Sequence, residues 1–321
     1  MHIDRTKPVA ETEAEEVISG QSSFLDQLDI GRTMRAAYKE AETDVGNLVK
    51  ASEIVHLSPV NGVHLSVGAR KILNMMIHRA AGNAWRDELF SISKKELRGT
   101  HKSNKRITKY INELMSALVT VDCLSPRGKE AKASIHLLEG RIEENDDTDG
   151  LFYFKFHHYL RAVLQKSQTY AVLNMKTVHA FESQYSLIMY EICSQRIDMR
   201  RPDMTLKIED IRKVFNIPEN KYPTFAGLYR RVLEGAQKEV NALAPFVVEL
   251  EKQFAGKKVI AVRFKIYRND QEADELAGRL LNLNRDERRA LVNRTNADGK
   301  TFTQIAMALD MEEKAARYGL N

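Results

Sequence analysis

The sequence predicts a helix-rich α+β fold made of two tandem units of one architecture, followed by a C-terminal helical extension. The chain has 321 residues, enough for two domains at roughly 150 residues each. The same order of amphipathic helices and short alternating strands occurs twice along it. Apolar residues make up 43% of the chain, with only 7 Pro and 16 Gly. This composition excludes collagen-like, low-complexity and wholly disordered chains.

Residues 1–45 are polar and acidic, which predicts a disordered acidic arm. The N-terminus lacks the apolar centre of a signal peptide, and no stretch approaches about 18 apolar residues. We therefore expect a soluble, cytoplasmic protein with no membrane partner. The two cysteines, Cys123 and Cys193, are expected to be reduced and buried rather than bridged.

The first unit is assigned to residues 46–165. Apolar spacing predicts a helix over 65–80, and Ser93 with Glu96 forms a capping box that opens a short helix. A longer helix over 103–118 follows, with its apolar residues on one face. Short strands are expected at 90–92, 119–123, 133–138 and 151–156, and the acidic stretch 139–150 is expected to be a solvated loop.

The second unit is assigned to residues 166–268. A helix is expected over about 176–195, and a longer one over 225–243, where apolar residues recur at helical spacing. Residues 269–321 are expected to form a helical tail of unknown role. The remaining elements are a strand at 205–208, a short helix at 209–215, and a hairpin of 246–251 and 258–267 around Gly256.

Helix, strand, helix, helix and hairpin is the order of a winged helix, a relative of the helix-turn-helix. In such a unit the second, longer helix of the pair can enter a DNA major groove. The charge distribution agrees with this. The chain carries a net charge of +5, but residues 1–30 carry −5 and residues 269–321 carry −2, which leaves +12 on the middle. A basic body between acidic ends is typical of a protein that binds a polyanion.

The solvent-facing positions of the longer helix are basic in both units. Arginine can bind a guanine edge with two hydrogen bonds, whereas lysine more often neutralises a phosphate. We therefore predict that Arg230 and Arg231 read bases and that the hairpin lysines contact phosphates. The alternative is that these are ordinary solvated helix faces. The candidate DNA contacts are Lys221, Tyr222, Thr224, Arg230, Arg231, Lys238, Lys257, Lys258, Arg263 and Lys265 in the second unit, and Lys94, Lys95, Arg98, Lys102, Lys105, Arg106 and Lys109 in the first.

Four motifs carry a family resemblance: SQYSLIMYE at 183–191, LKIEDIRKVFNI at 206–217, YRRVLEGAQKEVN at 229–241 and VIAVRFKI at 259–266. With them, residues 170–268 resemble the C-terminal winged helix of the iteron-type plasmid replication initiator (Rep) family. Met189 stands where that family usually has Leu, and Arg230 and Arg231 fall on its arginine pair. Residues 48–163 resemble the family's N-terminal winged helix more loosely.

The resemblance implies a non-enzymatic initiator that binds double-stranded DNA with direct repeats (iterons) at an origin. It also implies opening of an adjacent A·T-rich segment and recruitment of host replication initiator and helicase proteins. A homodimer, in equilibrium with the monomer and joined through the N-terminal unit, would repress its own gene. The opposing interpretation is a winged-helix transcriptional regulator without initiator activity.

We expect no cofactor, no metal and no catalytic residue. Gly299-Lys300-Thr301 lacks the first glycine of a phosphate loop, because Arg294 stands at that position. The nine histidines include no His-x-His pair of the kind that nicking initiators use. The segment 27–30 resembles the short peptides that bind the sliding clamp, but it lacks their terminal aromatic residue. An incidental apolar tetrad in the arm is the alternative.

Overall fold

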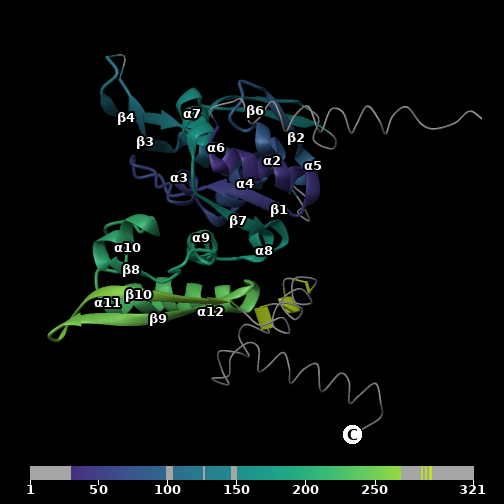
Figure 1. Ribbon diagram of the computed structural model, residues 1–321. Helices are drawn as coiled ribbons and strands as arrows, with labels where there is room; N and C mark the ends of the chain where they lie inside the picture. Colours follow the sequence, from purple (N-terminus) through teal and green to yellow (C-terminus); the bar gives the residue numbers. More distant parts are fainter. Residues whose placement is uncertain are drawn as a thin grey trace, which may run out of the picture.

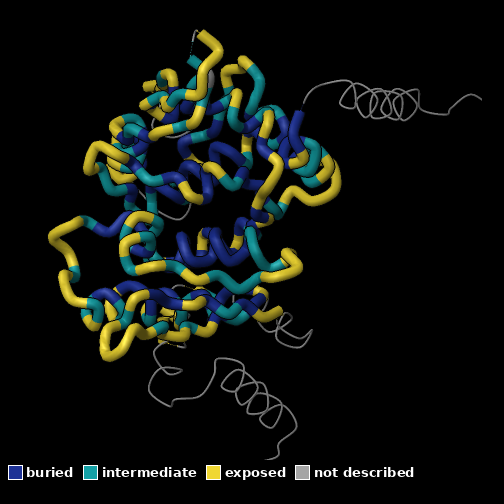
Figure 2. Tube along the Cα trace, turned by 60° about the vertical axis from the view of Figure 1, so that its left-hand side comes forward, coloured by how far each residue is buried: buried dark blue, intermediate teal, exposed yellow. Residues whose placement is uncertain are grey.

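Two winged helices lie against each other in the computed structural model, and the first unit is drawn above the second in Figure 1. The structure describes residues 30–98, 104–125, 127–145 and 150–268, with 283–284, 286–287 and 289–290. One contiguous apolar core runs through both units, and Figure 2 shows it as the buried interior of the tube. The predicted tandem of winged helices is confirmed.

The first unit includes the longer basic helix predicted over 103–118, which the structure places at Lys105–Ser116. Its helices are α2 (Arg32–Thr43), α3 (Ser52–Val55), α4 (Val67–Ala80), α5 (Lys94–Arg98), α6 (Lys105–Ser116) and α7 (His158–Lys166), with the 3₁₀ turn η1 (Ala81–Asn83). Its strands are β1 (Asn47–Ala51), β2 (Phe90–Ser93), β3 (Leu118–Leu124), β4 (Glu130–His136), β5 (Leu138–Glu143) and β6 (Leu151–Phe156).

The second unit follows the predicted order with two interruptions in its helices. Its helices are α8 (Met175–Ala180), α9 (Gln184–Arg196), α10 (Ile208–Val214), α11 (Phe225–Leu228), the π-helical η2 (Tyr229–Glu234) and α12 (Gly235–Leu243). Its strands are β7 (Tyr170–Asn174), β8 (Met204–Lys207), β9 (Phe246–Ala255) and β10 (Lys258–Arg268). The helix expected over 176–195 is broken after α8, because Ser183 caps a new helix by accepting a hydrogen bond from the Tyr185 amide.

The two units share a sheet topology that identifies their wings. The second unit has a three-stranded sheet in the order β8-β10-β9, and the first has the same order in β2-β6-β5. The hairpin β5–β6 is therefore the wing of the first unit, and β3–β4 is an extra two-stranded hairpin. The loop predicted over 139–150 is wrong for its first residues, which form β5. Only Leu138 of this edge strand is buried, so its sequence shows no alternation.

The prediction of a disordered arm over residues 1–45 is wrong for Arg32–Thr43, which form helix α2. Met34 and Ala37 are buried, and the Thr33 hydroxyl donates to the Thr169 carbonyl oxygen at 3.0 Å. Ile30 begins the same apolar stripe and is also buried. The average composition of the arm hid this short stripe at helical spacing. Residues 1–29, which include most of the predicted clamp-binding segment, lie outside the described residues.

A close backbone approach holds the start of α2. A Cβ on Gly31 would lie 2.0 Å from the Ser167 carbonyl oxygen and 2.7 Å from the carbonyl carbon of Lys166. We expect Gly31→Ala to lower the free energy of unfolding by about 1–3 kcal/mol, because a backbone segment must move. Gly235→Ala is the matched control, since a Cβ there meets nothing within 4 Å. It should stabilise its helix by up to about 1 kcal/mol. Urea unfolding of both variants checks the pair, and equal effects would contradict the close approach.

Strands β1 and β7 join the two ends of the first unit. They pair antiparallel over their whole length, from Asn47 opposite Asn174 to Ala51 opposite Tyr170. Residues 170–174 therefore pack with the first unit, and the boundary predicted at 165/166 falls too early. Cys193 is buried as expected, whereas Cys123 in β3 is only partly buried.

A buried ionic network connects the two units. Glu191 of α9 accepts hydrogen bonds from Lys50 Nζ of β1 at 2.7 Å and from Asn74 Nδ2 of α4 at 2.8 Å. Its other oxygen lies 3.4 Å from Arg70 Nη1 of α4. All four side chains are buried. Burial lowers the pKa of Lys50, and the Glu191 carboxylate opposes that effect.

Candidate nucleic-acid interface

The recognition helix of the second unit presents both arginines of the predicted pair to solvent. Thr224 caps its start, where the hydroxyl accepts from the Gly227 amide at 3.2 Å. Leu228 and Val232 are buried and fix the orientation of the helix on the core. Arg230 and Arg231 lie on the opposite, exposed side, and within the described part of the chain neither has an ion pair or hydrogen bond. Two guanidinium groups are thus free to bind DNA.

A π-helical turn contains both arginines, and the sequence carried a signal for it. The buried residues Leu228, Val232, Ala236 and Val240 follow one another at intervals of four. On an α-helix each such step drifts by about 40°, since a residue turns about 100°. A π turn holds more residues and absorbs part of that drift. The prediction of one regular helix over 225–243 is therefore wrong at η2. π turns are frequent at functional sites.

The wing of the second unit divides its basic residues into paired and unpaired groups. Arg263 Nη2 lies 2.8 Å from Asp203, and Lys265 Nζ lies 3.2 Å from Glu251. Lys257 and Lys258, at the hairpin tip, are exposed and have no recorded ion pair among the residues that the structure describes. The unpaired tip is therefore the better candidate for a phosphate contact, because a paired cation must first exchange its partner.

The remaining candidates of the second unit surround the start of the recognition helix. The Arg212 guanidinium donates to the carbonyl oxygens of Lys221 and Tyr222 and so holds this loop. Tyr222 adopts a φ of 51°, in the left-handed region. The Lys221 side chain is exposed. Lys238 is exposed further along the helix but lies 3.0 Å from Glu234.

In the first unit, the structure divides the predicted basic cluster. Lys94 is 4% exposed, and its amino group lies 3.3 Å from Glu143 and donates to the Glu144 carbonyl oxygen. A side chain so buried does not reach a phosphate, so the DNA-binding role predicted for Lys94 is wrong. Arg98 donates to Asn104 Oδ1 at 3.1 Å. Exposed positions are occupied by Lys95, Lys105, Arg106 and Lys109, while Lys102 lies outside the described residues.

The outer face of α6 is hollowed. An open cavity of about 550 Å³ borders it, and the predicted contacts Lys105 and Lys109 are among its lining residues. Asn112 also lines the cavity and accepts from Arg141 Nη1 of β5 at 2.9 Å. The cavity therefore brings together two of the predicted DNA contacts, Lys105 and Lys109.

The wings of the two units differ in charge. The turn of the first wing begins with Glu143 and Glu144, whereas the second wing turns at Lys257 and Lys258. The extra β3–β4 hairpin instead carries exposed basic residues that the prediction missed, namely Arg127, Lys129 and Lys132. The sequence pattern that could have indicated them is three basic residues within six positions around a turn. Both the β3–β4 hairpin and the second wing extend toward the left in Figure 1.

We expect Lys257→Ala and Lys258→Ala each to weaken DNA binding regardless of sequence. Each lost phosphate contact should also flatten the dependence of log K on log salt by about one unit. Fluorescence anisotropy with specific and scrambled duplexes between low and moderate salt gives both values. Lys265→Ala, already paired with Glu251, is the control and should change the slope less. Unchanged slopes in both tip variants would remove this wing from the interface.

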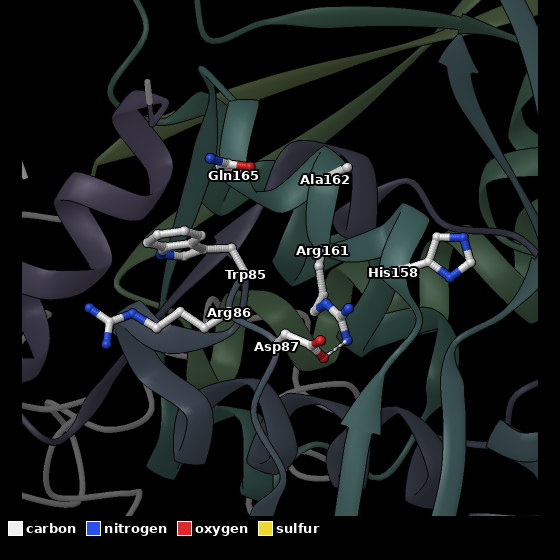
Figure 3. A pocket seen from close by; sticks show the side chains of 7 residues that line it. All are labelled: Trp85, Arg86, Asp87, His158, Arg161, Ala162 and Gln165. Carbon is white, nitrogen blue, oxygen red and sulfur yellow. Dashed lines mark ion pairs between the residues drawn. The ribbon is translucent and has the colours of Figure 1, made fainter. Parts of the chain in front are cut away.

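A separate cavity of about 470 Å³ lies between the segment before β2 and helix α7, away from all the predicted contacts. Figure 3 shows Arg161 pointing to Asp87, at 3.0 Å, while Arg86 points away. A hydrogen bond from Lys155 lowers the pKa of Asp87, so that carboxylate is already satisfied. The lining residues are Trp85, Arg86, Asp87, His158, Arg161, Ala162 and Gln165.

The described ranges contain no group of three or more His, Cys, Asp or Glu side chains arranged to hold a metal ion. Within the same ranges, no helix is long and apolar enough to cross a bilayer. Most of the predicted helical tail lies outside the description. In its described part, Arg289 Nε lies 3.9 Å from Glu182 of the second unit.

Comparison with known proteins gives two family matches. The family described as Initiator Replication protein, WH1, matches residues 47–194, and the one described as Initiator Rep protein, WH2, matches residues 207–266. No curated protein sequence matches the chain. The first match includes β7, in agreement with its pairing to β1, and extends through α8 and most of α9.

Two solved structures are similar. The Pi initiator protein in complex with iteron DNA is 13% identical, with a TM-score of 0.54, over 71% of this chain and 100% of that one. Domains 2 and 3 of RctB are 11% identical, with a TM-score of 0.39, over 63% of this chain and 80% of theirs. The first likeness shows a shared fold. Together the two family matches span well over half of the sequence, in the order of the two winged helices. The chain therefore belongs to the initiator Rep protein family.

Proposed function

We propose that this protein initiates plasmid replication by binding direct repeats at an origin. One observation carries the proposal: the winged helix that matches the WH2 family presents Arg230 and Arg231 unpaired on its recognition helix. Lys257 and Lys258 are exposed at the tip of the wing of the same unit. Such an arrangement combines base reading with phosphate neutralisation. The fold is shared with an initiator seen in complex with iteron DNA, which supports the same use here.

Membership of the family supports the finer parts of the proposal. The bound protein promotes opening of an A·T-rich segment next to the repeats and recruits host initiator and helicase proteins. A dimer, in equilibrium with the monomer, represses the protein's own gene. The proposed DNA contacts are the candidate residues named in the sequence analysis, Lys94 excepted. No catalytic step, cofactor or metal is part of the proposal.

The test is footprinting of the purified chain on the DNA that flanks its gene. We expect protection of several direct repeats, each roughly two helical turns long, beside an A·T-rich segment. A transcriptional regulator with the same fold would protect only an inverted repeat at a promoter. Permanganate reactivity of thymines in the A·T-rich segment then measures opening, and no increase on adding protein would contradict the initiator role.

A further inference from the structure

The tip of the β9–β10 wing exposes apolar side chains beside unpaired lysines. Phe254 is 59% exposed and Ile260 is 47% exposed. Between them the chain turns at Gly256, whose φ is 61°, and continues through Lys257 and Lys258. Single exposed apolar residues are common, but two at one hairpin tip indicate a surface that becomes covered in a complex.

Phe254 lies on the face of the wing that carries the recognition helix. Side chains alternate along a strand, so Lys252 and Phe254 share one face of β9. Lys252 Nζ lies 4.2 Å from the centroid of the Tyr229 ring in η2. Phe254 is two residues nearer the tip. It therefore projects past the part of the helix that holds Arg230 and Arg231.

Ile260 is exposed because of an irregularity in β10. The register passes from Val259 opposite Phe254 to Ala261 opposite Gln253, which leaves Ile260 without a partner. A bulge of this kind interrupts the ladder, redirects a side chain and increases the local twist. It takes Ile260 out of the regular alternation at the point where the wing leaves the core.

Charge decides which partner fits this tip. Residues 252–262 contain three lysines and no acidic residue. A second copy of the chain would bring the same positive charge to the contact, whereas duplex DNA offers phosphates on both sides of a groove. Proteins that bind the minor groove insert Phe, Leu or Ile between base steps and hold the backbone with Lys or Arg.

We propose that Phe254, with Ile260 exposed at the bulge of the same wing, is an apolar wedge that enters the minor groove and opens one base step of the repeat. That groove adjoins the major groove taken by the recognition helix. Lys257 and Lys258 bind the phosphates on either side. The inference rests on the proposed DNA binding and adds to it a defined point of distortion in the duplex.

The test moves an abasic site step by step along a duplex that carries one repeat. An abasic site removes stacking, so the wedge has less to separate when the site coincides with the step it opens. We expect the full-length wild type to bind about 10-fold more tightly at one such position. Phe254→Ala should lose this gain, and Phe254→Leu, which keeps an apolar wedge, should retain most of it. Anisotropy titrations give the affinities, and thermal unfolding verifies that the variants fold.

Tyr267→Ala is the matched control, because Tyr267 is a 45% exposed aromatic residue at the opposite end of the same hairpin. It should keep the gain. A wild type that binds the repeat equally at all abasic positions overturns the wedge and leaves DNA binding standing, whereas failure to bind any repeat overturns both. A Phe254→Ala variant that keeps the gain also overturns the wedge. A Phe254→Ala variant that keeps the gain but no longer self-associates would likewise overturn the wedge, because the wing tip would then be a protein–protein contact.

Discussion

Replacing Glu191 with alanine is expected to lower the free energy of unfolding by about 3–5 kcal/mol, because it leaves buried cations without a counter-charge. Glu191 is the carboxylate that Lys50 and Arg70 share, and all three side chains are almost fully buried. Asn74 also loses an acceptor for its amide. The Arg70 Nε has no hydrogen-bond partner even in the intact protein, so the site has no spare acceptor for the freed cations.

Urea unfolding followed by circular dichroism measures this loss. Glu219→Ala removes an exposed carboxylate on the second unit and should change stability by less than about 0.5 kcal/mol. Glu191→Gln keeps the volume and one acceptor, and should fall between the two. A loss below about 1 kcal/mol for Glu191→Ala would mean that Lys50 and Arg70 gain other partners and that the network does not hold the units together.

Removing a base-reading arginine should have the largest effect on DNA binding. We expect Arg231→Ala to weaken binding to the cognate repeat by about 1–3 kcal/mol, and Arg230→Ala by a similar amount, while specificity relaxes at the contacted positions. The reason is geometric: a guanidinium forms two parallel hydrogen bonds with a guanine edge, and alanine forms none. Titrations with the cognate repeat and with single-base variants of it measure both effects.

Arg32→Ala is the matched control. Arg32 is an exposed arginine on α2 in the other unit, so its removal changes the net charge equally without touching the recognition helix. It should weaken cognate and scrambled DNA binding slightly and to the same degree. Equal losses on cognate and scrambled DNA in Arg231→Ala would instead make Arg231 a phosphate contact.

Local sequence patterns predicted most of the fold, because the formation of helices and hairpins depends mainly on residues close together in the sequence. The exceptions depend on partners distant in sequence. β5 is an edge strand whose pairing with β6 leaves it exposed, and its acidic sequence therefore resembled a loop. Helix α2 is stabilised by residues more than 100 positions away, such as the partners of Thr33.

The candidate site shows the same limit. Helical spacing placed Arg230 and Arg231 on the outer face, where the structure has them. It gave no way to distinguish Lys94 from its exposed neighbours, because Lys94 is buried by its contacts with Glu143 and Glu144 in the wing. Glu191 offered a signal that charge counting passed over. It is a lone acid in the apolar run of α9, where a carboxylate must find buried partners.

The antiparallel pairing of β1 with β7 sets an order of events on the ribosome. The first unit is the earlier part of the chain to be made, yet its opening strand has no partner until residues near 174 have left the exit tunnel. Even then Lys50 and Arg70 lack their carboxylate until Glu191 follows. Closing so long a loop costs conformational entropy, and this cost increases with the logarithm of the loop length. The nascent first unit thus completes its fold only as the second begins to emerge.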